Sequence, residues 1–576
     1  MEPETSPPRH EAREDKPSDI DRAAAGAAAV ASDFARLAPQ KKAELLDRVA
    51  EGLNRVSADI VALGCEAKGI PRGSRAEAEE WFAGPSVAVG LARHHAAALR
   101  EIDRGGRPSL SRWRISRTRD GRTVTRLVPR FTGGGLIETG MSFAVLHTRG
   151  TTPADIARGQ AELARASEPG TTAVLGAGNV ASIPIADVLH SLFVENRTAV
   201  LKMNPVNAYL RAPFEAAFAP LLAQGYVQIV DGGAAAGAHL VESRDITHVH
   251  LTGSADTHDR IVWGPPGAER EDRKSRGEPL LKKPVTSELG NISPAIVPPY
   301  LYSTGEIRAI AENLATQLTN NASFNCNAGK MLVLPRGFPQ RKLLLDTLVK
   351  VLEGVPLRRA YYPGAKDRHT ALTSGRQGVF HIGAPADGQL PWSIVTEVDA
   401  SNDGEPLFST EPFCSMLSVV ELGSLDPMEF LPEAVRFCNE RLWGTLSACL
   451  FAPSLYEEDN RVEHEIERAV QGLEYGAVGV NVWPAVVYAT PRAPWGGHPK
   501  GTLADVQSGI GFVHNPLLLP AIEKTIVRGP LVPLPKPPFI VGHKHALPAA
   551  RKLTAYSDAP GLGAALSVVK TTLLGD

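Results

Sequence analysis

Apolar positions along the chain follow two periods, and the change between them divides the sequence. From Asp21 to about Leu99 the chain is Ala-rich, and its apolar residues recur at helical spacing, as in FARLAPQKKAELLDRVAEGLNRVSADIVALG. Residues 121–150 differ, because TVTRLVPRF and SFAVLHT predict strands on either side of a glycine turn at 133–135. We therefore expect a helical N-terminal region followed by a hairpin-like segment.

Beyond this segment, short apolar strands alternate with helical patterns. TTAVL, TAVLK, YVQIV and THVHL predict strands, and helices are expected near 183–196, 208–223 and 234–242. This alternation is typical of a parallel, doubly wound α/β sheet. The charged stretch 268–283 predicts an exposed loop that leads out of this first unit. A second α/β unit is expected over 291–510, with strands in PAIVP, MLVLP and MLSVVEL.

Composition narrows the function classes. Lys and Arg total 61 and Asp and Glu total 63, so the net charge of −2 gives no overall field that attracts nucleic acid or an anionic membrane. No stretch predicts a membrane span, and residues 1–19 lack the apolar core of a signal peptide. The five cysteines are widely spaced without a C-x-x-C pair, which indicates reduced thiols. We expect a soluble, cytoplasmic protein.

The first candidate for chemistry is the glycine turn Gly176-Ala177-Gly178-Asn179, which follows the TTAVL strand and precedes a helix. It fits G-x-G-x-x-A, the fingerprint of a dinucleotide fold. The next strand then ends in Lys202, where an ordinary dinucleotide fold has an acid. Two interpretations stay open on this evidence: a pyrophosphate site, or a tight turn that lets a helix pack closely on a sheet.

Two further candidates are Cys326 and Glu288. Small polar residues surround Cys326 in NNASFNCNAG, which favours a solvent-reachable loop, whereas Cys65, Cys414, Cys438 and Cys449 are expected to be buried apolar residues. A thiolate is a strong nucleophile, and nearby amides or helix termini lower the pKa of a thiol from about 8.5. Glu288, which stands before Leu289-Gly290, carries no such signal on its own, because a lone glutamate at such a turn is usually solvated; the case for it rests on the segments around it.

Together these segments identify a resemblance. The chain resembles the aldehyde dehydrogenase superfamily in eight segments that keep their order between residues 167 and 512: SEPGTTAVLGAGNV, AVLKMNP, HLTGSAD, KPVTSELGNISPAIV, NCNAGK, STEPFCSMLSVVEL, APWGG and SGIGF. The resemblance implies an α/β fold of two doubly wound lobes with a β oligomerisation hairpin. We expect a disordered tail over 1–19, a cofactor-binding lobe over 20–290 that includes the hairpin, a catalytic lobe over 291–510, and a return and extended tail over 511–576.

The resemblance also implies roles for three catalytic residues. Cys326 matches the thiol that attacks the aldehyde carbon to give a thiohemiacetal and then a thioester. Asn179 matches the side-chain amide that stabilises the oxyanion together with the Cys326 backbone N–H. Glu288 matches the general base that activates water for hydrolysis of the thioester.

Five other residues match positions that hold NAD or NADP in the family. Lys202 resembles the lysine that reaches the adenosine ribose, which explains the cation at the end of that strand. Gly253 and Ser254 resemble the residues near the pyrophosphate, where a helix begins. Glu411 and Phe413 resemble the carboxylate at the nicotinamide ribose and its aromatic neighbour.

The sequence departs from the family pattern at several places. Ala177-Gly178 replace the usual Pro-Trp, which implies a roomier or differently shaped floor beside Asn179. Cys414-Ser415 replace Gly-Pro, so the loop that carries Glu411 is expected to differ. Pro205 stands where strict NAD users often carry a glutamate, so NADP stays open beside NAD. Three interpretations stay open for a loop insertion before Glu288, an insertion at 498–507 and the long tail: they line a substrate entrance, make subunit contacts, or are neutral surface growth.

The function expected is the NAD(P)-dependent oxidation of an aldehyde to a carboxylic acid. Two alternatives stay open: a CoA- or thiol-dependent acylating dehydrogenase or acyl-thioester reductase, and a catalytically silent nucleotide-binding scaffold. A homodimer or homotetramer is expected through the hairpin-like segment. No metal, nucleic-acid or membrane partner is expected, and His248 and His250, which share a strand face, are interpreted as a packed or surface pair.

Overall fold

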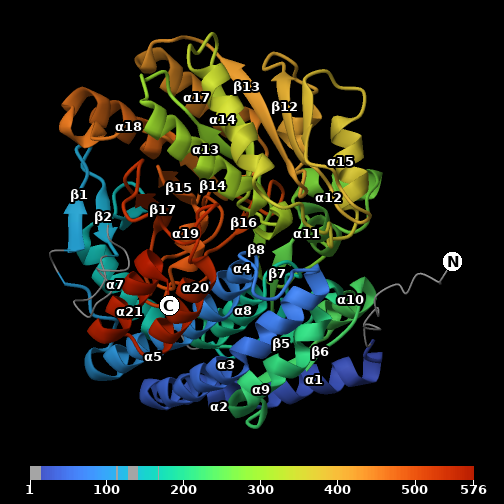
Figure 1. The fold of residues 1–576 in the computed structure, drawn as a ribbon. Coiled ribbons are helices and arrows are strands. Elements are labelled where there is room, and N and C mark those ends of the chain that lie inside the picture. Colours follow the sequence, from blue (N-terminus) through green and yellow to red (C-terminus); the bar gives the residue numbers. More distant parts are fainter. Residues whose placement is uncertain (1–13, 112–113, 128–139, 166–167, 576) are drawn as a thin grey trace.

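The computed structural model describes residues 14–111, 114–127, 140–165 and 168–575. Two β-sheets, each covered by helices, lie one above the other, and the N-terminal helices form the base of the molecule (Figure 1). The predicted α/β fold with parallel sheets is confirmed. No helix among the described residues is long and apolar enough to cross a bilayer.

The predicted Ala-rich helical region forms the base. Its elements are α1 (Pro17–Ala29), α2 (Ala31–Arg36), α3 (Pro39–Lys68), α4 (Glu77–Trp81), the short η1 (Phe82–Ser86) and α5 (Val87–Gly105). Helix α3 begins with a proline in its first turn, where no backbone N–H is needed, and ends at Gly69, which adopts the left-handed conformation that favours glycine. Because α1 begins at Pro17, the prediction that the tail is disordered through residue 19 is wrong at its end; residues 1–13 lie outside the described residues.

The first sheet has six strands in the order β16-β8-β7-β4-β5-β6. Its strands are β4 (Thr171–Leu175), β5 (Thr198–Lys202), β6 (Val227–Val230), β7 (His248–Gly253), β8 (Val285–Leu289) and β16 (Gly509–Ile510). Its helices are α8 (Ser182–Phe193), η3 (Pro205–Leu210), α9 (Arg211–Leu222), α10 (Ala234–Glu242), α11 (Ala255–Val262) and α12 (Ala268–Arg276). The four strands and three helices predicted here are present, since strands covered on both faces read as continuous apolar runs.

The strand order of this sheet creates a crevice. From β4 the chain continues outward to β5 and β6, then returns to the other side of β4 to form β7 and β8, all of them parallel. The turns after β4 and β7 therefore leave the same edge of the sheet in opposite directions. Ligands of open parallel sheets bind at such a switch point, outside the carboxyl ends of the strands.

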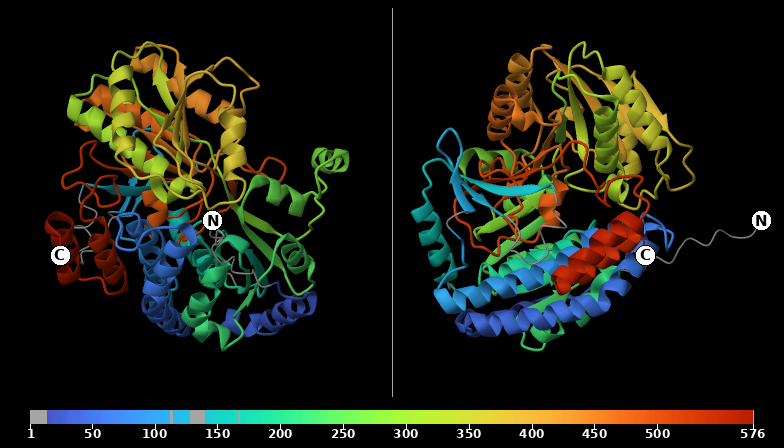
Figure 2. Two further views of the ribbon diagram at one scale, coloured as in Figure 1. Left: turned by 45° about the vertical axis from the view of Figure 1, so that its right-hand side comes forward. Right: turned by 60° about the vertical axis from the view of Figure 1, so that its left-hand side comes forward.

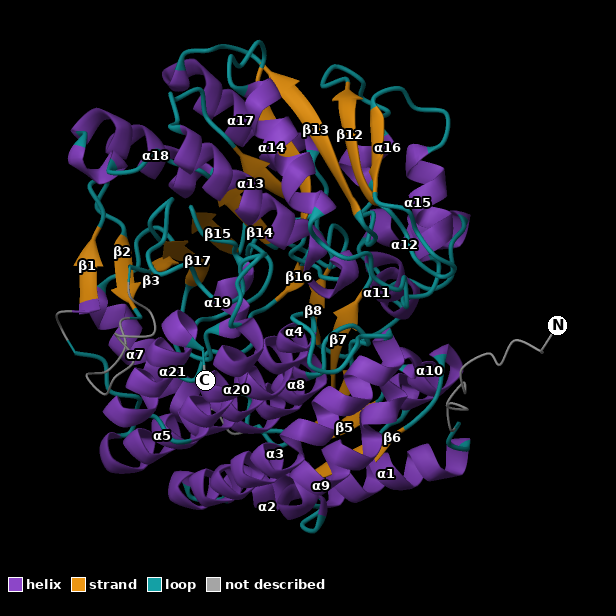
Figure 3. Ribbon diagram, viewed as in Figure 1, coloured by secondary structure: helices purple, strands orange, loops and turns teal. Residues whose placement is uncertain are grey.

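The second sheet has eleven strands in the order β1-β2-β3-β17-β15-β14-β9-β10-β13-β12-β11. Its strands are β1 (Ile115–Arg117), β2 (Thr123–Arg126), β3 (Ser142–His147), β9 (Ser293–Ile296), β10 (Gly329–Pro335), β11 (Val379–Ile382), β12 (Trp392–Val398), β13 (Met416–Leu422), β14 (Ser447–Leu450), β15 (Ala477–Val480) and β17 (Ile522–Arg528). The strands predicted in PAIVP, MLVLP and MLSVVEL are β9, β10 and β13. All three lie in the parallel centre of this sheet (Figure 3).

Helices cover both faces of the eleven-stranded sheet. They are α7 (Pro153–Arg165), α13 (Thr304–Thr319), α14 (Arg341–Glu353), α15 (Ala365–Thr373), α16 (Pro406–Ser409), α17 (Pro427–Arg441), α18 (Asn460–Gly472) and α19 (Ala485–Ala489), with the short turns η4 (Asn320–Ser323) and η5 (Tyr456–Glu458). Helix α13 begins at a capping box in which Ser303 and Glu306 satisfy each other's backbone N–H groups. This helix leads directly to the loop that carries Cys326.

Three segments differ from, or add to, what the sequence predicts. The charged stretch 268–283 was expected to be a loop, but its first nine residues form α12, which has no buried residue and carries acids in its first turn and bases in its last, where they complement the helix dipole. Strands β2 and β3 pair antiparallel, and β3 continues onto β17, so the hairpin-like segment joins the second sheet; residues 128–139, with the glycine turn, lie outside the described residues.

The last segments of the chain, part of the expected extended tail, are helical. Helices α20 (Ala546–Asp558) and α21 (Leu562–Leu574) lie side by side against the N-terminal helices α4 and α5 (Figure 2). Residues 531–541, here called the strap, connect the second sheet to α20. The C-terminal end of the chain therefore packs against the helices of the N-terminal region.

Candidate functional site

The candidate nucleophile Cys326 lies just after a turn of unusual backbone conformation. In η4, the three consecutive residues Asn321, Ala322 and Ser323 have positive φ angles of 50°, 54° and 71°. Such angles cost a residue with a side chain about 1–2 kcal/mol each, so the surrounding structure must hold the turn in place. Of the five cysteines, all in the described ranges, Cys326 alone is not buried. The prediction that distinguished it from the other four is confirmed.

The side chain of Asn321 holds this turn. Its Nδ2 donates hydrogen bonds to the carbonyls of Asn179 at 3.1 Å and Phe324 at 3.0 Å. Its Oδ1 accepts from Lys68 Nζ at 3.1 Å and from the Tyr361 hydroxyl at 2.9 Å. A single buried amide thus ties the cysteine loop to the glycine turn of the first sheet and to helix α3.

Lys68 is the centre of a buried cluster that sequence analysis did not identify. Its Nζ donates to both carboxylate oxygens of Glu80, at 2.8 and 3.0 Å, and to the Asn179 carbonyl at 3.0 Å. The side chains of Lys68 and Glu80 are only 5% and 7% exposed, so this ion pair lies in the interior. The pair positions Asn179 and the cysteine loop relative to each other.

We expect the Lys68→Met variant to lose about 3–5 kcal/mol of unfolding free energy, because it leaves the Glu80 carboxylate buried without its cation. Chemical denaturation of wild type and variant measures this loss. The double variant Lys68→Met/Glu80→Leu removes both charges and should regain most of the stability. Equal losses in the single and double variants would contradict a paired role.

Glu288 lies at the carboxyl end of β8, opposite Gly509 of β16. The Cys326 Sγ donates to Glu288 Oε1 over 3.5 Å. Glu288 is 3% exposed, and this burial raises the pKa of its carboxyl to about 7, with a further contribution from the Asp187 carboxylate. Glu288 is therefore not the solvated residue that a lone glutamate at such a turn usually is, and it can hold or accept a proton near neutral pH.

The electrostatics at Cys326 also differ from the expectation. Burial raises the pKa of the Cys326 thiol well above its ordinary value, and the carboxylates of Glu288 and Glu411 act in the same direction. The amides and helix termini that were expected to lower it do not dominate. The resting group is thus a neutral thiol beside a carboxyl that titrates near pH 7, so this thiol needs a base in order to react.

Asn179 lies on the same cavity wall as Cys326 and Glu288. Its Nδ2 donates to the Phe324 carbonyl, two residues before the cysteine, at 2.9 Å. The floor beside it is not roomier, as Gly178 had implied, because a Cβ at residue 178 would lie 2.6 Å from Asn204 Oδ1 and 2.8 Å from Val206 Cβ. The side chains of Asn204 and Val206 thus fill the space that a larger residue would take.

A second buried cluster was also missed. His250 Nε2 lies 3.3 Å from Asp187 Oδ1, and Thr252 Oγ1 donates to Asp187 Oδ2 at 2.8 Å. Burial opposes a charge on His250, but the Asp187 carboxylate outweighs it and raises the pKa of this histidine. His250 is 5% exposed and packed, as interpreted from the sequence. Nothing in the local sequence distinguishes Asp187, whose partners come from β7.

The predicted cofactor residues divide between two places. Lys202, Gly253 and Ser254 lie at the carboxyl edge of the six-stranded sheet: Lys202 Nζ donates to the Gly232 carbonyl at 3.2 Å, and Ser254 caps the first turn of α11 by accepting from the Thr257 N–H. Glu411 lies on the other lobe, where its Oε1 accepts from the Asn291 N–H at 3.2 Å.

Two neighbours complete the surroundings of Glu411. Burial raises the pKa of the Glu411 carboxyl to about 7, which the charge of Lys330 opposes. Lys330 itself donates to the Ser323 hydroxyl at 2.8 Å and so braces the cysteine loop. Phe413 packs against Phe324 and Tyr362, with ring centroids 5.7 and 4.9 Å apart. The loop that carries Glu411 is therefore held against the loop that carries Cys326.

These residues fit a dinucleotide. The turns after β4 and β7 flank the switch point of the six-stranded sheet, and Gly253 and Ser254 are exposed there at the start of α11. A helix N-terminus with exposed small residues accepts phosphate. The edge carries Lys202, while Glu411 on the other lobe acts on the pKa of the Cys326 thiol and Phe413 packs against Phe324, two residues before Cys326.

The comparisons agree with this arrangement. Residues 159–368 match the model of the aldehyde dehydrogenase family. The aldehyde dehydrogenase KauB from Pseudomonas aeruginosa shares 17% identity and a TM-score of 0.62, over 89% of each chain. A Mycobacterium tuberculosis aldehyde dehydrogenase complexed with NAD+ shares 18% identity and a TM-score of 0.61, over 91% of this chain and 92% of that one.

A third solved structure, an NADP-dependent glyceraldehyde-3-phosphate dehydrogenase from Bacillus halodurans complexed with NADP, shares 16% identity and a TM-score of 0.57, over 89% of this chain and 92% of that one. No curated protein matches the sequence. At these identities the solved structures establish the fold, while the family match covers the segment from α7 to α15 that includes Asn179, Glu288 and Cys326.

Proposed function

We propose that this chain, a member of the aldehyde dehydrogenase superfamily, oxidises an aldehyde to a carboxylic acid with NAD or NADP through a thioester on Cys326. The observation that carries the proposal is the placement of Cys326 Sγ 3.5 Å from Glu288 Oε1 on the wall of one cavity. A nucleophile and a base within reach of each other, with an amide donor beside them, is the arrangement that acyl chemistry needs.

The first step follows from the neutral thiol. The Glu288 carboxylate accepts the proton of the Cys326 thiol, and Sγ then attacks the aldehyde carbon. The carbonyl oxygen becomes an oxyanion, which accepts hydrogen bonds from Asn179 Nδ2 and the Cys326 backbone N–H. A donor of this kind contributes about 10²–10³ to the rate. The Asn321 amide and the Lys68 ion pair keep Asn179 beside the cysteine loop.

Lys202, Gly253 and Ser254 would hold the adenosine and pyrophosphate end of the dinucleotide, and Glu411 and Phe413 the nicotinamide end. When bound, the nicotinamide ring accepts the hydride that leaves the thiohemiacetal carbon. The carbon then remains on Cys326 as a thioester. Glu288 releases its first proton to solvent and accepts a second one from water, which hydrolyses the thioester to the acid.

The position of Glu288 favours hydrolysis over acyl transfer to CoA. A carboxylate beside Cys326 can deprotonate a water molecule that lies next to the carbonyl carbon of the thioester. Absorbance of the reduced nicotinamide, followed with and without CoA, tests this. Turnover without CoA supports the proposal. Turnover only with CoA would assign the chain to the acylating alternative, and cofactor binding without turnover over an aldehyde panel would favour the scaffold.

The raised pKa of Glu288 predicts a pH profile. Below pH 7 the carboxyl is protonated and cannot accept the thiol proton, so kcat/KM should fall about tenfold per pH unit there and level off above pH 7. Initial rates between pH 5 and 9 measure this profile. A flat profile through pH 7 would show that Glu288 does not act as the base.

A further inference from the structure

One cavity of about 1050 Å³ extends from Cys326 to the C-terminal helices. Its size is at the upper end of small-molecule sites, which typically measure about 300–1,000 Å³. A short aldehyde needs only the end of it that Cys326, Glu288 and Asn179 line. The remaining length has no part in the chemistry proposed above, so it is available to the body of the substrate.

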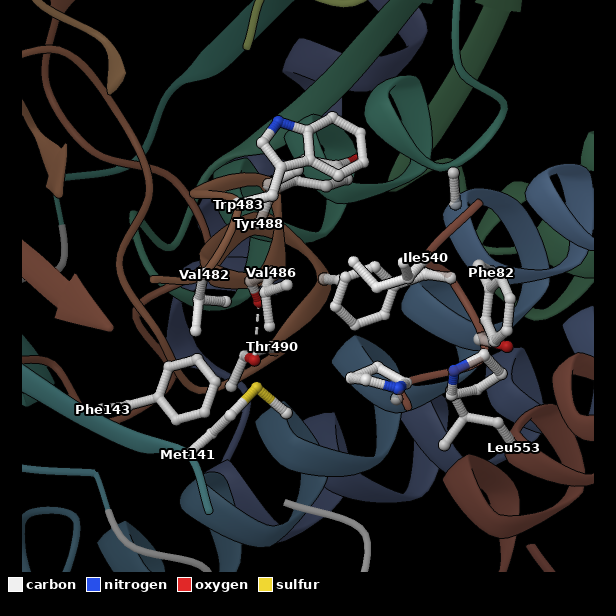
Figure 4. A pocket seen from close by; sticks show the side chains of 18 of the residues that line it. Phe82, Met141, Phe143, Val482, Trp483, Val486, Tyr488, Thr490, Ile540 and Leu553 are labelled. Carbon is white, nitrogen blue, oxygen red and sulfur yellow. Dashed lines mark hydrogen bonds between the residues drawn. The ribbon is translucent and has the colours of Figure 1, made fainter. Parts of the chain in front are cut away.

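The walls of this remaining length are apolar. Figure 4 shows Met141, Val482 and Val486 on one side and Phe82, Ile540 and Leu553 on the other, with their side chains directed into the space between them. Trp483, which is 5% exposed, also lines the cavity and donates its indole N–H to the Asn327 carbonyl, next to Cys326, at 2.9 Å. The uncharged polar side chains Asn179, Asn325 and Asn327 gather at the Cys326 end.

The charged side chains on the lining have partners within the chain. Arg93 pairs with Asp558 at 2.7 Å, and Arg308 and Lys536 both pair with Glu312, at 3.1 and 2.6 Å. Glu79 pairs with Arg358 at 3.1 Å. Each named charge thus has a partner of opposite sign, with Arg308 and Lys536 sharing Glu312, and this pairing weakens the attraction of these groups for a charged substrate.

The strap and the two last helices form the far wall. Twenty of the 58 lining residues follow Gly529, so this wall is made by the segment that the sequence analysis left open as an entrance lining, a subunit contact or neutral growth. The strap is anchored at its C-terminal end: the Val541 N–H donates to Thr316 Oγ1 at 2.9 Å, and Arg75 donates to the Ile540 carbonyl at 2.8 Å. These two contacts join the end of the strap to α13, the helix that leads to Cys326, and to the N-terminal helical region.

Helix α20 is fixed in the same way. The hydroxyls of Ser86 and Thr554 lie 2.6 Å apart, and Arg551 pairs with Glu77 at 3.0 Å. With the Arg93–Asp558 pair, these contacts hold α20 against η1 and α5 with Leu553 facing the cavity. Because hydrogen bonds and ion pairs from several elements hold this wall in place, it is a fixed part of the cavity.

We infer that the cavity selects aldehydes with a long, uncharged hydrocarbon body, and that the strap and α20–α21 form the wall against which this body packs. The inference rests on the proposed function for the reaction at Cys326 and adds the substrate class. Each methylene moved from water to such a wall adds about 0.8 kcal/mol, or roughly fourfold in kcat/KM.

The test compares propanal, hexanal and decanal on the full chain. For the wild type we expect kcat/KM to rise at least about hundredfold from propanal to decanal. The variant Leu553→Trp places an indole in the far end, and the ratio of decanal to propanal should fall at least about tenfold, because overfilling opposes the longer substrate. Leu547→Trp on the same helix, outside the cavity lining, is the matched control and should keep the wild-type ratio.

A second variant and a binding measurement separate the two proposals. Val486→Phe narrows the cavity from the opposite wall and should lower the same ratio if Leu553→Trp does not fold. Calorimetry with 1-decanol, which cannot be oxidised through a thiohemiacetal, reports binding alone. Decanol binding that Leu553→Trp weakens, without oxidation of any aldehyde, would keep the apolar site and reject the proposed function. Oxidation of propanal with no gain for decanal, or a preference for succinic semialdehyde, would overturn the inference.

Discussion

Replacing Cys326 with alanine is expected to lower aldehyde oxidation by at least about four orders of magnitude, because Cys326 is the only thiol among the described residues that line the cavity. The variant keeps Asn179 and Glu288, so it should still bind the dinucleotide with nearly wild-type affinity. Steady-state rates with NAD and NADP, together with cofactor titration by fluorescence, measure both properties on the same preparation.

Cys438→Ala is the matched control for this substitution. Cys438 is fully buried in the core of the second lobe, so its replacement should cost stability and leave kcat/KM within about twofold of wild type. Alkylation provides an independent readout, since Cys326 is the one cysteine that is not buried. Iodoacetamide should modify one site, faster as the pH rises, because the pKa of that thiol is raised. Residual turnover above one hundredth of wild type in Cys326→Ala would point to a different nucleophile.

The parts of the fold that the sequence predicts well are those whose signal is local. The strands β4, β5 and β7 are covered on both faces and therefore read as continuous apolar runs. Cys326 could be distinguished from the buried cysteines for a similar reason, because its immediate neighbours are small and polar. The order of the eight family-like segments then related Asn179, Glu288 and Cys326, which lie far apart in the sequence.

The residues that sequence analysis missed act through partners distant in sequence. Lys68 contacts Asn321, which is 253 positions away in the sequence. Asp187 on α8 contacts His250 on β7. Neither has a local pattern, because a buried ion pair is defined by what lies opposite it in the fold. The same holds for Gly178: the sequence shows a missing side chain, while only packing shows that Asn204 and Val206 take its place.

The C-terminal helices were missed for a different reason. The run LVPLPKPPF lacks helical periodicity, and α20 carries Pro548 within its first turn, where a proline is tolerated. Three of the four alanines of α20 are buried, and the helix packs against α4 without a conspicuous apolar stripe. Such a helix is stabilised by close packing, which composition does not reveal.

The second large effect is expected for Glu288→Gln. A glutamine cannot accept the proton of water, so hydrolysis of the thioester should slow by about 10²–10⁴ and the acyl group should accumulate on Cys326. Rapid mixing of this variant with NAD(P) and aldehyde should give a slow rise of up to one reduced nicotinamide per active site, followed by almost no turnover. Mass spectrometry of the quenched protein should find the acyl group on the peptide that contains Cys326.

The stability of Glu288→Gln provides its control, because the substitution is expected to lower activity and to raise stability at pH 8. Burial raises the pKa of Glu288 from 4.5 to about 7, so the folded state holds a proton that the unfolded state releases between these values. The stability that this proton confers is complete below pH 4.5 and is lost as the pH rises through 7, a loss of about 3 kcal/mol. Glu288→Gln should therefore melt above wild type at pH 8 and close to it at pH 4. A variant that is inactive and also less stable at pH 8 would indicate a structural role for Glu288, whereas an inactive and more stable one identifies a carboxylate kept in the interior for its proton chemistry.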